Sequence, residues 1–274
     1  HTSGQTGTTT YHVTVTTGVK DIAGNVMAST YLFSYTTIDA SAPAVTVFTV
    51  PSFSTSRDIP INTFTVTDNS AVTGHKLTTS ATPPLSGDSG WTLNAPAAYT
   101  VASDGTYTLF PWAKDEAGNI SALFATPRTV TVDTLAPAVS LTIPPDKATG
   151  ITIDSDVSIS FSENVDCNTV TVTSVTISPA AGWTKTSCSG SQAVFTPSGQ
   201  TGLTTYVIVA TTAVKDIAGN QLSADFQFLY YTADVTAPAV TSFTATSTST
   251  GLNIPITSFT ATDNIAVTGY KITT

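Results

Sequence analysis

The chain has 274 residues, of which only 10% are charged and roughly a fifth are threonine, and its net charge is −9. Because it has no cluster of basic residues, nucleic acid is not an expected partner. No apolar run approaches the length of a membrane span. Apolar residues make up 41% of the sequence, which is enough to build real cores and excludes a disordered chain.

Short segments that alternate or are rich in β-branched residues follow one another along the chain, separated by Gly, Pro, Asn, Asp and Ser. No segment keeps a helical period, so we expect short strands throughout. In chain order, the predicted strands are YHVTVTT from 11, INTFTVTD from 61, TYTLFPWA from 106, RTVTVD from 128, SLTI from 140, DVSISFSE from 156, TVTVTSVTI from 169, YVIVATT from 206 and FQFLYYT from 226.

A long stretch of the sequence returns after 195 residues. VKDIAGN occurs at 19–25 and again at 214–220, and AKDEAGN at 113–119 is a looser version. When residues 1–79 are aligned without a gap on 196–274, 46 of the 79 positions are identical. A repeat of this length suits two domains of ordinary size rather than one turn of a solenoid.

A second marker divides the repeat, since Asp39, Asp133 and Asp234 each begin a D-x-x-A-P segment. Proline fixes its own φ and biases the preceding residue towards extended geometry, so these segments are predicted to be short, stiff linkers. We expect the chain to be a window on a longer repetitive polypeptide. The predicted parts are the C-terminal part of a type B module (1–38), a whole type A module (39–132), a whole type B module (133–233) and the N-terminal part of a type A module (234–274).

About a hundred residues and about seven short strands in each module are typical of an immunoglobulin-like (Ig-like) β-sandwich. The predicted fold is therefore all-β, with tandem Ig-like β-sandwiches in an extended array. Trp112 and Trp183 are expected in or beside the cores. Tyr11, Tyr107 and Tyr206 fall near the start of the penultimate strand, where such sandwiches often place a corner tyrosine.

The motifs of both modules resemble known bacterial families. Type B carries FSENVD at 161–166 and the VKDIAGN turn, and it resembles the bacterial Ig-like family first described in S-layer proteins. Type A, with TAPAVT at 236–241 and GTYTLFPWAKDEAGN at 105–119, resembles Ig-like repeats of large bacterial adhesins. The resemblance implies a mostly architectural role outside the cell and indicates no particular ligand.

The K-D-x-A-G-N segments join the last two predicted strands of each sandwich, and their Gly and Asn residues are typical of a hairpin turn. The linker is expected at the same end of the sandwich. Carboxylates and amides gathered there are ligands that Ca²⁺ takes, so one hypothesis is calcium at the interdomain junctions. The other is that each Asp caps its own turn. The candidate ligands are Asp39, Asp68, Asn69, Asp115 and Asn119 in type A and Asp133, Glu163, Asp166, Asp216 and Asn220 in type B.

Two cysteines, Cys167 and Cys188, lie in the type B module. An even pair in a chain this poor in lysine indicates an oxidising, extracellular setting and a disulfide between them; two buried thiols are the alternative. The histidines, His1, His12 and His75, are not grouped with a nucleophile and a carboxylate, and no His/Cys cluster suits zinc. We therefore expect no enzyme.

Three functions remain open for such a chain. The first is a structural segment of a long extracellular bacterial surface protein, a stalk or fibre or a filament building block, with neighbouring Ig-like modules as partners and with self-association through uncharged strand edges. The second is an adhesive module that binds a glycan or a surface protein, for which Trp91 is the candidate aromatic. The third is a spacer in a secreted multidomain enzyme.

Overall fold

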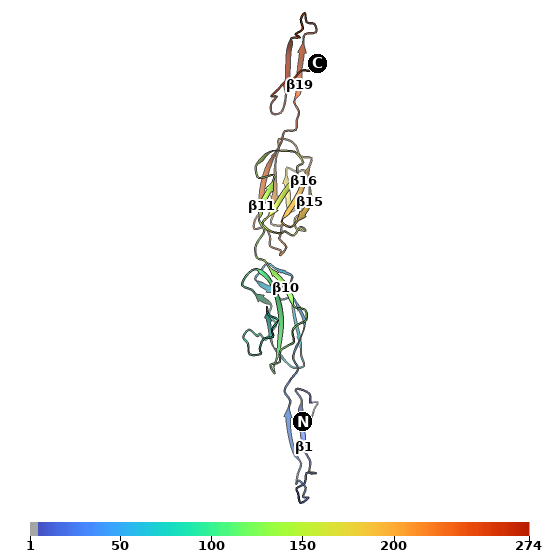
Figure 1. Cartoon of the computed structure of the whole chain (residues 1–274), viewed down its shortest axis with the longest axis vertical. Helices are drawn as coiled ribbons and strands as arrows, with labels where there is room; N and C mark the ends of the chain where they lie inside the picture. The colour runs from blue at the N-terminus through green and yellow to red at the C-terminus, as the bar shows by residue number, and fades with distance from the viewer. Residues whose placement is uncertain (1–4, 274) are drawn as a thin grey trace. The chain divides into compact units, whose positions relative to one another are not determined.

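The structure is a computed structural model that describes residues 5–273, and these residues form strands and turns with no helix among them. The chain divides into two compact units, of which the first ends at Leu135 and the second begins at Ala136. Figure 1 colours the strands in chain order, from β1 in blue to β19 in red. The described part of the chain holds no helix long and apolar enough to cross a membrane.

A two-stranded hairpin opens the first unit. Strands β1 (Thr10–Val15) and β2 (Tyr31–Thr36) pair antiparallel along their whole length. A similar isolated pair, β19 (Ala239–Ala245) and β20 (Ile256–Thr262), closes the second unit. These two pairs correspond to the predicted partial modules at 1–38 and 234–274.

The type A module forms the rest of the first unit. One sheet has the order β4-β10-β9-β7, and two antiparallel pairs, β3 with β6 and β5 with β8, complete it. Its core gathers Phe48, Ile59, Leu109 and Val130. The strands are β3 (Ala44–Thr49), β4 (Phe53–Ser54), β5 (Asp58–Pro60), β6 (Thr63–Thr67), β7 (Val72–Thr78), β8 (Ala98–Thr100), β9 (Gly105–Asp115) and β10 (Arg128–Val132).

The type B module forms a sandwich of two four-stranded sheets, in the orders β11-β13-β16-β15 and β12-β18-β17-β14. The apolar residues that alternate along β13, β16, β17 and β18 point between the sheets and make one core. The strands are β11 (Val139–Ile143), β12 (Ala148–Ile151), β13 (Val157–Phe161), β14 (Val175–Ser178), β15 (Gly182–Ser189), β16 (Gln192–Ser198), β17 (Thr205–Ala210) and β18 (Phe226–Thr232).

Each complete module has eight strands rather than about seven, because its first strand is divided. In type B, Pro144 and Pro145 separate β11 from β12, and the two pieces join different sheets. Proline has no N–H to donate, so it interrupts a sheet ladder where the chain crosses between sheets.

The predicted tryptophan and tyrosine positions are confirmed. Trp112 is fully buried, and Trp183 packs against the type B core. Tyr107 lies near the start of β9 and donates its hydroxyl to the Ser103 carbonyl at 2.7 Å. Tyr206, in β17, accepts the Thr201 N–H at 2.9 Å, and Tyr11, in β1, accepts the Thr6 N–H at 2.8 Å.

Equivalent residues of the two type B copies differ in burial. Phe228 is 1% exposed, whereas Phe33, its counterpart in the opening hairpin, is 46% exposed. Tyr230 and Tyr35 differ in the same way, at 1% and 39%. In the complete module the second sheet covers this face, so the same two aromatic residues either line a core or lie on an exposed surface.

Candidate functional site

The K-D-x-A-G-N turn has the same construction in all three copies. The Asp side chain accepts the backbone N–H of the Asn four residues later with one oxygen and the Asn side-chain amide with the other. These pairs are Asp21 with Asn25 (both 2.8 Å), Asp115 with Asn119 (2.8 and 2.7 Å) and Asp216 with Asn220 (2.9 and 2.8 Å). We call this two-bond arrangement the Asp–Asn clip.

Backbone geometry explains why this sequence forms the clip. Gly24, Gly118 and Gly219 all have positive φ, at 93°, 89° and 106°, which glycine adopts without a Cβ penalty. The backbone N–H of each Asp also donates to the carbonyl of the Asn, over 2.9 to 3.2 Å. The clip therefore closes a tight hairpin between the last two strands of each module.

The Asp of each D-x-x-A-P linker forms a second repeated turn. One carboxylate oxygen accepts the backbone N–H two residues later, which is an Asx-turn. The N–H donors are those of Ser41 to Asp39 (2.9 Å), Leu135 to Asp133 (3.0 Å) and Thr236 to Asp234 (2.9 Å). Each linker therefore begins with a locally fixed backbone.

The linker before the type A module is also held by that module. The Asn69 amide donates to both oxygens of Asp39, at 3.2 and 3.3 Å. The Asn119 amide, already part of the clip, donates to the carbonyls of Asp39 and Ser41 at 3.2 and 3.1 Å. We call these contacts the linker anchor. The Asn69–Asp39 contact recurs in the closing hairpin, where the equivalent Asn264 donates to Asp234 at 3.0 Å.

Three carboxylates meet at the type A linker anchor. One oxygen from each of Asp39, Asp68 and Asp115 lies within 4.8 Å of the others, and Asp39 and Asp115 are buried. The Ser41 N–H, followed by the Ser70 and Asn69 side chains, holds the pKa of Asp39 below its ordinary value. All five predicted type A ligands therefore lie at one end of the module. The aspartates Asp39 and Asp115 accept hydrogen bonds there, and Asn69 and Asn119 donate them.

Two of the type B candidates come together within the second unit. Glu163 and Asp216 each bring a carboxylate oxygen within 4.8 Å of the other, and Asn220 is the amide of the clip. Asp166 caps its own loop, as in the second of the two hypotheses, because its carboxylate accepts the N–H and the amide of Asn168, at 3.0 and 2.9 Å. Asp133 follows β10 in the first unit, where its N–H donates to Ser54.

The type A module also holds the linker by which the chain leaves it, a feature that the sequence analysis missed. Asp104 accepts the backbone N–H of Thr134 at 2.9 Å and its hydroxyl at 2.8 Å, and Arg57 Nε at 3.1 Å. These donors, the Thr134 N–H first, lower the pKa of Asp104. The scarcity of arginine in the chain was a signal that could have drawn attention to Arg57.

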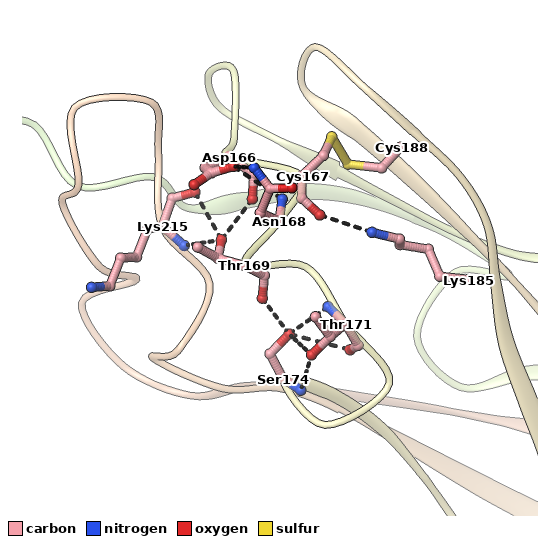
Figure 2. Close-up of a disulfide and its surroundings, with 9 residues drawn as sticks. All are labelled: Asp166, Cys167, Asn168, Thr169, Thr171, Ser174, Lys185, Cys188 and Lys215. Atoms are coloured by element: carbon pink, nitrogen blue, oxygen red, sulfur yellow. Dashed lines mark hydrogen bonds between the residues drawn. A yellow bond between two sulfur atoms is a disulfide. The ribbon is translucent and has the colours of Figure 1, made fainter.

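Cys167 and Cys188 form a disulfide, with their Cα atoms 5.7 Å apart (Figure 2). It ties the loop after β13 to the end of β15. Lys185 extends towards that loop and donates to the Cys167 carbonyl at 2.8 Å. Further along the loop, the Ser174 hydroxyl donates to the Thr169 carbonyl at 2.7 Å. The disulfide therefore fixes a loop that already has its own hydrogen-bond network.

Trp91, the candidate glycan contact, is packed into its own loop. Its indole N–H donates to the Leu85 carbonyl at 3.0 Å. The ammonium groups of Lys76 and Lys114 lie 5.7 and 5.2 Å from its ring centroid and donate to the Ser89 and Ser86 carbonyls. The ring thus organises the loop between β7 and β8, and no exposed aromatic cluster surrounds it among the described residues.

Comparison with known proteins identifies the type B segment. Residues 133–232 match the family described as a bacterial Ig-like domain, whereas no curated protein matches the chain. The chain is similar to the fibronectin(III)-like modules of Clostridium thermocellum CbhA, with 15% identity over 69% of this chain and 95% of that one and a TM-score of 0.32. It is similar to the Escherichia coli adhesin FdeC, with 12% identity over 82% and 75% and a TM-score of 0.35.

A third similar structure is surface layer protein SbsC, domains 1–6, with 10% identity over 88% of this chain and 37% of that one and a TM-score of 0.24. The family match covers the same residues that form the two-sheet β-sandwich of type B. Residues 133–232 thus match a bacterial Ig-like domain family, and they hold the two-sheet β-sandwich of the type B module.

Proposed function

We propose that the chain is a non-catalytic structural segment of an extracellular bacterial surface protein, a stalk, fibre or filament building block. The observation that carries the proposal is the linker anchor. The linker Asp is fixed by an Asx-turn at Ser41, Leu135 and Thr236, and an Asn of the following strand pair holds Asp39 and Asp234. A chain that fixes its linkers repeatedly is suited to keeping its modules spaced.

The chemistry of the clip and the anchor supports a non-catalytic role. The carboxylate of Asp115 accepts two hydrogen bonds from its turn and that of Asp216 accepts three, the third from the Gly219 N–H, so their oxygens stabilise backbone structure. The match to a bacterial Ig-like family supports the bacterial setting. The Cys167–Cys188 disulfide supports a location outside the cytoplasm, because disulfides persist in oxidising compartments.

Protease treatment of intact cells that produce the protein tests this location. A surface segment is cleaved by added protease while a cytoplasmic marker in the same cells stays intact, and peptides from 39–232 appear in the supernatant. Release of these peptides only after cell lysis would contradict the proposal.

We propose in addition that Asp39, Asp68 and Asp115 hold a Ca²⁺ ion at the type A linker anchor. The support is the donor set, three carboxylates within 4.8 Å of one another, since hard oxygen ligands suit calcium. A bound ion would neutralise their mutual repulsion and hold the linker more firmly. Asn69 and Asn119 donate N–H groups in the structure, so they would bind the ion only after their amides rotate.

Thermal unfolding of the full chain tests calcium binding without any assay of function. Calcium should raise the unfolding temperature of the type A module relative to chelator, because a ligand that binds only the folded state stabilises it. Asp68→Asn should abolish this shift while leaving unfolding in chelator nearly unchanged, since Asp68 contributes one side-chain bond, from Ser70. Identical thermal unfolding curves with and without calcium would rule out the proposed calcium site.

A further inference from the structure

The longest connection in the type A module is the loop 79–97, which joins β7 to β8. Loops of this length are uncommon in compact domains and are usually functional or disordered. Three side-chain bonds to its carbonyls fix this loop, from Lys76 to Ser89, from Lys114 to Ser86 and from Trp91 to Leu85, at 2.8, 2.9 and 3.0 Å. A loop held in one shape is suited to a contact that needs that shape.

Part of this loop exposes apolar side chains. Residues 82–85, which we call the apolar tip, have the sequence TPPL, and Leu85 is 73% exposed. No charged residue lies between 79 and 87. Single exposed apolar residues are normal on a protein surface, so the backbone of the tip decides whether it suits burial.

The backbone N–H groups of the apolar tip are either absent or already bonded. Pro83 and Pro84 have no N–H to satisfy. The other two donate within the loop, from Leu85 to the Asp88 carboxylate at 2.9 Å and from Thr82 to the Ser80 hydroxyl at 3.1 Å. Burying a polar group without a partner is costly, and the N–H groups of the tip avoid this cost.

An apolar groove lies elsewhere on the same module. It is lined by residues 42–45 and 122–125, whose sequences APAV and ALFA contain apolar side chains alone, and its volume is about 420 Å³. The groove beside β11 in type B is smaller, at about 290 Å³, and its lining includes Ser140, Thr142 and Asp146. The type A module thus carries both an apolar tip and a groove without polar side chains.

The apolar tip and the groove belong to opposite sides of β9. β7 pairs with one side of β9, and Thr92, in the loop that carries the tip, bridges to His75 on the free edge of β7. On the other side of β9, Lys114 bridges to Ile120, and the groove residues 122–125 follow directly. A contact between the tip of one copy and the groove of another is therefore heterologous, and such a contact builds an open row of copies unless it closes into a ring.

We propose that the apolar tip of one copy of this chain docks into the type A groove of a neighbouring copy, with Leu85 as the residue that enters the groove. The contact assembles copies side by side. The inference rests on the proposed structural role, and it names the surfaces through which such a segment forms a filament.

Charge favours a second copy as the occupant of the groove. The chain has a net charge of −9, whereas neither the apolar tip nor the groove lining carries a charged residue. Two copies therefore meet without local repulsion at these surfaces. The repeat supplies further sites, because APAV returns at 237–240 in the next type A segment, and weak contacts repeated along two chains strengthen one another through effective concentration.

Cross-linking of two purified full-length variants tests the contact. One variant carries Thr82→Cys in the tip, and the other, distinguished by a mass tag, carries Ala44→Cys in the groove. The two native cysteines are already bonded to each other, so mild oxidation should join the two new thiols into a mixed dimer. Absence of the mixed dimer, or a predominance of dimers of one variant with itself, would overturn the inference.

A matched pair of leucines tests the apolar tip itself. Leu85→Glu, added to the Thr82→Cys variant, should lower the yield of mixed dimer by about tenfold or more, because it places a carboxylate in an apolar groove. Leu93→Glu changes a residue of the same loop that is 69% exposed but lies outside the tip, and it should leave the yield close to that of the parent pair. Equal yields in the two variants, whether retained or lost, would overturn the inference.

The cross-linking result and the surface location are separate measurements. Only thiols that lie side by side are joined, so association through another surface, such as the exposed aromatic face of the β1–β2 hairpin, does not produce the mixed dimer. A failed cross-link would leave the surface location standing, because the protease experiment on intact cells measures it independently.

Discussion

Asp115 accepts two hydrogen bonds from Asn119, and the same Asn119 amide holds the carbonyls of the incoming linker. One side chain therefore stabilises both a turn and the entry of the chain into its module. The turn could be predicted from its Gly and Asn residues, because it depends on neighbours in the sequence. Asn69 is 30 residues from Asp39, so their contact depends on the sandwich that brings them together.

The glycine of the clip is required by its backbone angle. Gly118 has φ of +89°, and a Cβ placed there would meet only ordinary contacts, the nearest at 3.7 Å. Gly118→Ala should therefore lower the free energy of unfolding of type A by about 1–2 kcal/mol through backbone strain alone. Gly87→Ala, in open space and without a positive φ, is the matched control. Equal effects of both variants in denaturant unfolding would contradict this explanation.

Asp39 should make the linker anchor sensitive to acid. Hydrogen bonds, first from the Ser41 N–H, hold its folded-state pKa below the ordinary value of 3.8. A carboxylate with a lowered folded pKa contributes its stability above the unfolded value and loses it as pH falls through the folded value. At neutral pH, the melting temperature of type A should therefore be higher in the parent chain than in the Asp39→Asn variant. This difference in melting temperature should shrink as the pH falls below 3.8.

Ser41→Ala is the control for this pH dependence, because it keeps the backbone N–H that donates to Asp39. Its melting temperature should follow the parent across the same pH range. A difference between the parent and Asp39→Asn that persists unchanged at low pH would show that the Asp39 charge does not stabilise the anchor.

At the scale of elements, the strands were predictable and their partners were not. Alternation in DVSISFSE and FQFLYYT indicated β13 and β18, because residues on a half-buried strand face inward at every second position. The division of the first strand into β11 and β12 was missed. It depends on which sheet each piece joins, and that choice is made by strands distant in the sequence.

The repeat supplies a matched test of core packing. Phe228 is 1% exposed inside type B, whereas Phe33 is 46% exposed in β2. Phe228→Ala should destabilise type B by about 3–5 kcal/mol, the usual cost of emptying a buried aromatic site. Phe33→Ala should leave the unfolding of both complete modules unchanged. Similar shifts in both variants, measured by calorimetry, would contradict the burial difference.

The disulfide should stabilise only the module that contains it. Closing a loop with a sequence separation of 21 residues contributes about 3 kcal/mol by restricting the unfolded chain. Replacing Cys167 and Cys188 together with Ala should therefore lower the stability of type B by about that amount. The type A transition, recorded in the same scan, should stay in place, and a shift of both transitions would show that the modules do not unfold independently.

For the whole molecule, the sequence was enough to recognise a tandem array, because 46 of 79 aligned positions repeat without a gap. The resemblance of the FSENVD and VKDIAGN motifs also pointed to a bacterial Ig-like module, which the family match at 133–232 supports. The linker contacts could not be predicted from the sequence, because the pairing of β9 with β10 brings Asp104 and Thr134 together.

The most direct test of the central claim is immunogold labelling of intact cells with an antibody raised against residues 133–232, read as the distance of the gold particles from the cell boundary. A structural surface segment predicts labelling of cells that have not been permeabilised, with particles displaced outward from the envelope. Labelling that appears only after permeabilisation, or that lies inside the boundary, would contradict the account.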